Sequence, residues 1–274
     1  MELEGRYRRA AEALRGARAL VVTAGAGMGV DSGLPDFRGD QGFWQAYPPY
    51  RRLGLSFVDC ANPEHFERDP AFGWGFYGHR AALYRSTEPH PGFGMLRRWI
   101  DRLGLAAFVV TSNVDGQFQK AGFPEEAVLE IHGSIRHLQC CTPCNGEIWE
   151  AGAPVEVDLA TMRARDVPRC PACGGVARPN ILMFGDMAWL PGRSEAQRRR
   201  FERFAEAHGE EPSVVVEMGA GTAVPSIRWT TEQLGRGEGA LVVRINPREP
   251  QIAAPHLSLP VGALEGLSGI DRAL

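Results

Sequence analysis

Lysine is almost absent from this chain: a single lysine, Lys120, stands against twenty-nine arginines. We interpret this as a coding bias toward arginine and not as phosphate recognition. The formal net charge is −3. A chain without an excess of positive charge lacks the electrostatic attraction that binds nucleic acid or anionic membranes broadly. We therefore expect no nucleic-acid partner and no membrane partner. The arginine run at 198–200 lies in a helical pattern and is interpreted as a solvated face.

Long apolar runs are missing as well. No run approaches the ~18 residues of a membrane-spanning helix, and residues 1–9 lack the apolar core of a secretory signal. The sequence therefore predicts a soluble protein with a cytoplasmic location, where thiols stay reduced. In that compartment the six cysteines favour metal or redox chemistry over disulfides.

Short apolar runs alternate with helical patterns along most of the chain. Each run is rich in Val, Leu or Ile and is bounded by Gly, Asn or Pro, as buried parallel strands are. This alternation predicts an α/β fold with a Rossmann-like, doubly wound parallel sheet. The predicted strands are 19–23, 106–111, 128–131, 213–218 and 241–245, and the predicted helices are 2–16, 92–102, 194–207 and 225–235.

Two segments interrupt the alternation. The first, 42–85, is rich in aromatic side chains and ends in a helical pattern from about residue 70, which predicts a cofactor loop and a helical cap. The second, 138–178, contains five of the six cysteines and predicts a metal-binding module. We expect the Rossmann-like domain to comprise the remaining residues, 1–41, 86–137 and 179–274.

The cysteines form two Cys-x2-Cys pairs, which are typical of a zinc module. Cys141 and Cys144 make the first pair, and Cys170 and Cys173 the second. Four thiolates suit tetrahedral Zn²⁺ and leave no coordination position for water, so we expect a structural metal. Cys140 could replace Cys141 as a ligand; we favour Cys141.

The glycine-rich segment after the first predicted strand indicates a nucleotide site. Gly25, Gly27 and Gly29 would let the backbone approach a phosphate, and a following helix would offer free N–H groups to an anion. Polar side chains also follow the other predicted strands. Because the carboxyl ends of parallel strands meet at one edge of a sheet, we expect all of these groups to converge there.

Six blocks in this order resemble the sirtuins. They cover most of the chain and are the segments 25–38, 111–115 with 121–122, 131–134, the two cysteine pairs, 178–186 and 244–246. The resemblance implies a Rossmann-like domain with a small zinc module, and NAD as a co-substrate. It further implies an NAD-dependent protein-lysine deacylase that acts on acylated-lysine proteins or peptides and releases nicotinamide and O-acyl-ADP-ribose.

The resemblance also assigns roles to individual residues. His132 matches the general base, and an imidazole with a near-neutral pKa suits that task at pH 7. The other positions are predicted to bind NAD. Gly25, Ala26 and Gly27 would line the diphosphate, Asp36, Phe37 and Arg38 would belong to the loop that closes on NAD, Asn113 and Asp115 would lie beside the nicotinamide, and Gly219 and Asn246 would meet the adenosine. Asp115 could instead be a helix N-cap.

The acylated peptide is expected to lie along residues 181–184, which include Phe184, by strand addition. Tyr77 and Arg80, spaced Tyr-x2-Arg on the predicted cap helix, resemble the pair that lets some sirtuins accept malonyl or succinyl lysine. A guanidinium and a phenol can bind a terminal carboxylate. An aromatic helix face with a solvated arginine is the alternative.

The match departs from the usual sirtuin pattern in three places. Ser112 stands where the family usually has glutamine, Gly29 where it usually has serine, and the block at Gly219 lacks the usual Thr-Ser pair. The changes at Ser112 and Gly219 leave open a protein mono-ADP-ribosyltransferase or an NAD glycohydrolase. The cysteine pairs also permit a zinc-ribbon binding module on an inactive Rossmann scaffold.

Overall fold

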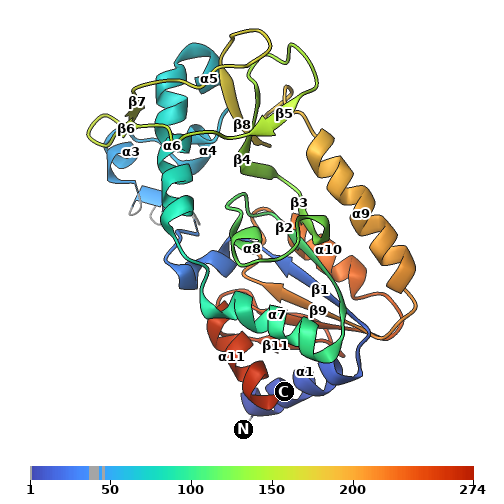
Figure 1. Ribbon diagram of the computed structural model, residues 1–274. Helices are drawn as coiled ribbons and strands as arrows, with labels where there is room; N and C mark the ends of the chain where they lie inside the picture. Colours follow the sequence, from blue (N-terminus) through green and yellow to red (C-terminus); the bar gives the residue numbers. More distant parts are fainter. Residues whose placement is uncertain (1, 37–42, 45–46) are drawn as a thin grey trace.

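A six-stranded parallel sheet forms the centre of the larger part of the molecule (Figure 1). The computed structural model describes residues 2–36, 43–44 and 47–274. Strand order is β11-β10-β9-β1-β2-β3. Strands β1, β2 and β3 follow one another toward one edge of the sheet, and β9, β10 and β11 follow one another toward the other edge, so the strand order switches between β1 and β9. The strands are β1 (Ala19–Ala24), β2 (Ala106–Thr111), β3 (Val128–Glu130), β9 (Ser213–Met218), β10 (Ala240–Ile245) and β11 (Leu257–Leu259).

Alternate residues of the strands supply two separate hydrophobic cores. Leu20 and Val22 of β1 belong to one core, whereas Val21, between them, belongs to the other. Because successive side chains of a strand point to opposite faces, a sheet covered by helices on both sides reads as a continuous apolar run. This is why the short apolar runs identify the strands within a residue or two of their observed bounds.

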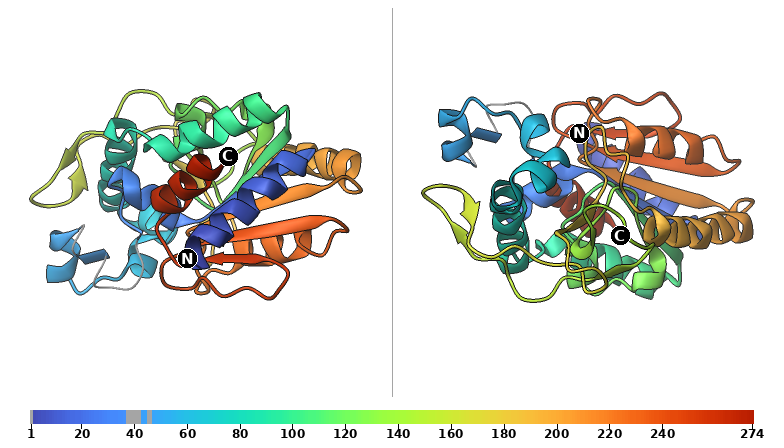
Figure 2. Two further views of the ribbon diagram at one scale, coloured as in Figure 1. Left: turned by 90° about the horizontal axis from the view of Figure 1, so that it is seen from below. Right: turned by 90° about the horizontal axis from the view of Figure 1, so that it is seen from above.

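Helices cover both faces of the sheet. The first core receives α1 (Glu2–Gly16), α7 (Pro91–Leu103) and α11 (Ala263–Ala273), which lie side by side in the left view of Figure 2. The second core receives α9 (Gly192–His208) and α10 (Ser226–Leu234). The four helices predicted from the sequence are confirmed, whereas α11 and β11 were not predicted.

The smaller part of the molecule lies above the carboxyl ends of the strands in Figure 1 and has its own aromatic core. Helix α6 confirms the helix predicted from about residue 70. This part consists of an antiparallel sheet of β5 (Ile148–Glu150), β4 (Gly133–Cys140) and β8 (Ala177–Ile181), a ribbon of β6 (Val157–Asp158) and β7 (Arg163–Ala164), and the helices α3 (Pro48–Arg52), α4 (Phe57–Cys60), α5 (Glu64–Arg68) and α6 (Pro70–Ser86).

The predicted domain boundaries stay a prediction. Strand β4 begins at Gly133, directly after the loop of His132, so the smaller part grows out of the edge of the parallel sheet. The larger part also contains the short helices η1 (Ala26–Ser32), α8 (Gln117–Lys120) and η2 (Glu125–Ala127). No helix among the described residues is long and apolar enough to cross a membrane.

Candidate active site

Loops at the carboxyl ends of β1, β2, β3 and β9 come together at one edge of the sheet. The Gly25 N–H donates to the Met218 carbonyl at 2.9 Å, and the Asn113 side-chain amide donates to the Gly25 carbonyl at 3.0 Å. The Ile131 N–H donates to the Thr111 carbonyl at 2.9 Å, which joins the loop of His132 to the end of β2. The structure therefore brings together the polar groups that the sequence placed at separate strand ends.

Close backbone packing explains the glycines after β1. A Cβ added to Gly27 would lie 2.6 Å from the Gly219 Cα, and one added to Gly25 would lie 2.8 Å from the Gly219 carbonyl oxygen. The helix expected after these glycines is present as the 3-10 helix η1. Gly29 has a different neighbour, because a Cβ there would lie 3.1 Å from the Leu34 Cδ1. The Leu34 side chain thus fills the space beside Gly29.

Asn113 and Asp115 lie in the loop between β2 and α8. Thr111 Oγ1 accepts from the Asn113 N–H at 3.0 Å, and Asp115 Oδ1 accepts from the Gln117 N–H at 2.9 Å. The N-cap residue of α8 is Gly116, so Asp115 is not the N-cap that the alternative interpretation proposed, although its carboxylate binds the first N–H of the helix. Asp115 keeps part of its surface exposed. Burial among protein atoms raises the pKa of Asp115 to about 6, and Glu130 adds to this, whereas Arg80 opposes it.

His132 lies in the turn between β3 and β4 and is held by backbone contacts on both sides. Its carbonyl accepts from the Leu182 N–H at 2.9 Å. Burial lowers the pKa of the imidazole below 6.5, although a hydrogen bond to the backbone of Ser112 works in the opposite direction. At pH 7 the ring is therefore mostly neutral, which is the form that can accept a proton.

Gly219 directly follows β9, and Asn246 directly follows β10. Gly219 has φ +60, a conformation that glycine adopts without strain. Asn246 is buried, and its side-chain amide donates to the Ala220 carbonyl at 2.7 Å while its Oδ1 accepts from the Arg248 and Glu249 N–H groups. Asn246 thus shapes the loop whether or not it also contacts a ligand.

One edge of this region is closed by an ion pair between Asp36 and Arg248. The pair connects the segment that follows η1 to the loop after β10. The other two predicted loop residues, Phe37 and Arg38, lie outside the described residues.

Tyr77 and Arg80 lie on α6 among aromatic rings, and both are buried. The Arg80 guanidinium carbon lies 5.2 to 5.6 Å from the ring centroids of four aromatic residues, and Arg80 donates to the Tyr84 hydroxyl at 2.7 and 3.1 Å. Tyr84 was not predicted from the sequence, although its spacing of four residues from Arg80 on a helix is a usable signal. Phe184 is 44% exposed, and its ring centroid is 6.2 Å from that of Phe57, one of the four rings around Arg80.

The cysteine cluster corrects one prediction. The thiols of Cys140, Cys144, Cys170 and Cys173 lie within 4.8 Å of one another, whereas Cys141, the favoured ligand, packs into the aromatic core. Cys140 is the last residue of β4 and Cys141 follows it, so the two side chains leave the strand in opposite directions. The choice of Cys141 over Cys140 was therefore wrong.

The geometry of the cluster suits Zn²⁺. Tetrahedral zinc with Zn–S bonds of about 2.3 Å separates its sulfur ligands by about 3.8 Å. The Sγ atoms of Cys140 and Cys173, and those of Cys144 and Cys170, are 3.7 Å apart. The four cysteines can thus hold a structural zinc ion that joins the end of β4 to the turn before β8.

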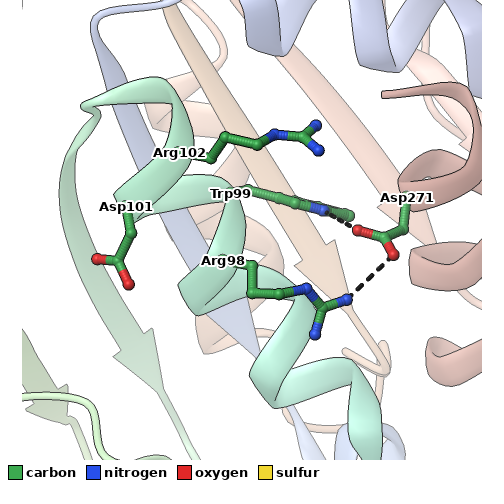
Figure 3. A pocket seen from close by; sticks show the side chains of 5 residues that line it. All are labelled: Arg98, Trp99, Asp101, Arg102 and Asp271. Atoms are coloured by element: carbon green, nitrogen blue, oxygen red, sulfur yellow. Dashed lines mark hydrogen bonds and ion pairs between the residues drawn. The ribbon is translucent and has the colours of Figure 1, made fainter.

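A separate open pocket of about 380 Å³ lies between α7 and α11 and contains none of the predicted site residues (Figure 3). Trp99 and Arg98 both donate to Asp271, at 2.7 and 3.1 Å. Its two arginines and two aspartates balance in charge. We assign it no role in the reaction.

Comparisons with known proteins agree with this geometry. The model of the Sir2 family matches residues 25–217. An NAD-dependent protein deacylase of Thermus thermophilus is 34% identical over 96% of this chain and 93% of its own length. NAD-dependent protein deacylase 1 of Pseudomonas aeruginosa is also 34% identical, with 92% of each chain covered.

The fold is shared with solved structures. A crystal structure of a Sir2 homologue in complex with NAD has a TM-score of 0.72 and 26% identity, and the match covers 96% of this chain and 92% of the other. The Rossmann-like fold and the use of NAD predicted from the sequence are confirmed. The chain therefore belongs to the Sir2 family of NAD-dependent protein deacylases.

Proposed function

We propose that this protein removes acyl groups from lysine side chains of other proteins, with NAD as co-substrate and nicotinamide and O-acyl-ADP-ribose as products. The observation that carries the proposal is the position of His132. A neutral imidazole lies at the same edge of the sheet as Asn113 and the Gly25 loop, and the Ser112 backbone that holds the ring adjoins Asn113. The deacylase relatives match the chain across this whole region.

In this proposal, each of the remaining site residues binds one part of NAD. NAD supplies the ribose carbon that the acyl oxygen attacks as nicotinamide departs. His132 accepts a proton from a ribose hydroxyl. The binding residues are Gly25, Ala26 and Gly27 for the diphosphate, Asn113 and Asp115 for the nicotinamide, Gly219 and Asn246 for the adenosine, and Asp36, with Phe37 and Arg38, for closure over the cofactor.

The proposal includes acyl chains that end in a carboxylate. Arg80 is 5% exposed and is surrounded by rings, so a carboxylate that reached it would form a charge-assisted hydrogen bond away from water. Burial raises the pKa of Tyr77 to about 12, so its phenol stays protonated as a donor. The exposed Phe184 ring lies 6.2 Å from the Phe57 ring, which in turn lies 5.6 Å from the Arg80 guanidinium, so apolar contacts extend from the surface to this pair.

Turnover of matched acetyl-lysine and succinyl-lysine peptides with NAD tests both the deacylase reaction and the recognition of a terminal carboxylate. His132→Ala should abolish turnover of both peptides. Arg80→Met should raise the KM for the succinyl peptide about tenfold or more, which corresponds to about 1.4 kcal/mol, and should change acetyl turnover little. An equal loss for both peptides would refute carboxylate recognition by Arg80.

The same assay separates the alternative reactions. Release of nicotinamide without any peptide would indicate an NAD glycohydrolase, and transfer of label from NAD to protein would indicate an ADP-ribosyltransferase. No consumption of NAD with acetyl, malonyl, succinyl or long-chain peptides would refute the deacylase itself.

A further inference from the structure

A fully buried ion pair braces the loop on which the peptide is proposed to lie. The guanidinium of Arg178, on β8, donates to Asp186 through both terminal nitrogens, at 2.7 and 2.8 Å. Both side chains are 0% exposed. The residues between them include Leu182 to Gly185, so the ion pair closes a short loop and fixes its two ends.

Asp186 also binds the backbone of this loop. Its Oδ2 accepts from the Met183 N–H at 3.3 Å, and its Oδ1 accepts from the Ala188 N–H at 3.2 Å. Each carboxylate oxygen therefore has one guanidinium partner and one backbone partner. The backbone is held on both sides of Phe184.

Two further buried side chains hold the following residues. Gln139 donates to the Ala188 carbonyl at 2.8 Å and accepts from the Leu190 N–H at 3.0 Å. Asn180 donates to the Leu190 carbonyl and to Gln139, both at 2.9 Å. Both residues are 0% exposed. The antiparallel sheet thus directs these buried polar groups to one surface loop.

Stability alone does not account for such an ion pair. Taking two charges out of water costs several kcal/mol per ion, and well-packed apolar residues in the same place often give an equally stable protein. The contacts here hold the backbone of a loop with three exposed apolar side chains: Leu182 is 39% exposed, Phe184 44% and Met187 97%. A surface that is already ordered binds an extended peptide without the entropic cost of ordering itself.

We propose that Arg178 and Asp186 are positioning residues that preform the segment Leu182–Met187 for the acylated peptide. The inference rests on the proposed function. It concerns binding of the peptide and leaves the binding of NAD and the chemistry at His132 unchanged. Neither residue needs to touch the peptide, since both act through the backbone of Met183 and Ala188.

Two variants and one control test the proposal. Asp186→Asn removes the carboxylate charge and places a side-chain N–H group beside the N–H donors of Arg178 and of the loop backbone. The double variant Arg178→Met, Asp186→Leu removes both charges and keeps the volume apolar, so it should fold with nearly unchanged Tm. The control is Arg163→Met, because Arg163 makes a comparable two-bond pair with Asp69 at 2.6 and 2.8 Å on the exposed surface of the smaller part.

The measurements are kcat, the KM for an acetyl-lysine peptide, the KM for NAD, and binding of the same peptide by fluorescence anisotropy. Both variants should raise the KM and Kd for peptide about tenfold, the equivalent of about 1.4 kcal/mol. Their kcat and KM for NAD should stay within about twofold of wild type, and Arg163→Met should behave as wild type.

A folded double variant with unchanged peptide affinity would overturn the proposal. So would a double variant that fails to fold, because the pair would then serve the fold itself, and so would an equal effect in Arg163→Met. These results differ from failure of the proposed function, in which the wild-type protein itself would turn over no acylated peptide.

Discussion

Opposing effects act on the pKa of the Asp115 carboxyl group. The hydrogen bond from the Gln117 N–H at the start of α8 lowers its pKa, yet burial and the nearby Glu130 raise the pKa to about 6. Because the folded-state pKa lies above the value of about 3.9 in an unfolded chain, the stability linked to this proton is present at low pH and is lost as the pH rises through 6. At pH 7.5 the ionised form is therefore a local cost to the fold.

Asp115→Asn should consequently stabilise the protein and weaken its use of NAD. The amide keeps an acceptor for the Gln117 N–H and removes the charge, so we expect a gain of about 1 kcal/mol at pH 7.5, discounted for partial exposure, and about half of that gain at pH 5, which lies between the unfolded and folded pKa values. Thermal melts at the two pH values, with the KM for NAD, check this. A lower Tm for the variant at pH 7.5 would contradict it.

The protonation of His132 should determine how kcat depends on pH. Burial holds its pKa below 6.5, and only the neutral ring accepts a proton, so kcat should be constant above about pH 7 and should fall as the pH decreases through that pKa. In Asp115→Asn the acidic limb of the profile that belongs to His132 should remain. A profile that becomes flat in this variant would assign the limb to Asp115.

At the scale of single elements, the adjacent thiols Cys140 and Cys141 offer a matched pair. Cys140 lies in the four-cysteine cluster, whereas burial in the aromatic core raises the pKa of Cys141 to about 11. Cys140→Ser should lose stoichiometric zinc and lower Tm by many degrees, because a structural site contributes folding free energy directly. Cys141→Ser should retain zinc. Metal analysis of both purified variants decides, and zinc retained by Cys140→Ser would overturn the assignment.

This pair also shows where sequence reasoning ends. Strands β2 and β9 were predicted at their observed bounds, because burial on both faces leaves an unbroken apolar run. The choice between two neighbouring cysteines depends instead on which face of β4 each one leaves, and the register of β4 against β8 is shifted by an irregularity between Ser134 and Leu138. The sequence carries no local signal for that shift.

The missed strand β11 and the missed ion pair of Arg178 have a similar explanation. Strand β11 has three residues, Leu257–Leu259, too few to display a period. The buried Arg178 could be recognised in the sequence only as part of a motif, because its partner Asp186 lies across a loop whose shape the pair itself determines. Local patterns predicted the scaffold, and the long-range contacts of buried polar side chains required the structure.

At the scale of the whole molecule, the two halves of the parallel sheet meet where the loops after β1 and β9 touch. Their backbones approach so closely that a Cβ on Gly219 would lie 2.3 Å from the Gly27 Cα, and Gly219 also has φ +60. This contact lies at the reversal of strand order, where doubly wound sheets bind their ligands. A change here should therefore affect the joining of the halves and the cofactor site together.

Gly219→Ala compared with Gly104→Ala isolates that contact. Gly104 ends α7 at φ +62, and a Cβ there would meet nothing within 4 Å, so its substitution should cost only the backbone strain of about 1 kcal/mol. Gly219→Ala carries the same strain and must also push Gly27 away, so we expect a loss of about 3 kcal/mol or more and a KM for NAD raised at least about tenfold. Denaturant unfolding and NAD kinetics measure the two effects. If both variants lost the same stability and kept the same KM for NAD, the close approach of the two loops would have no part in holding the cofactor.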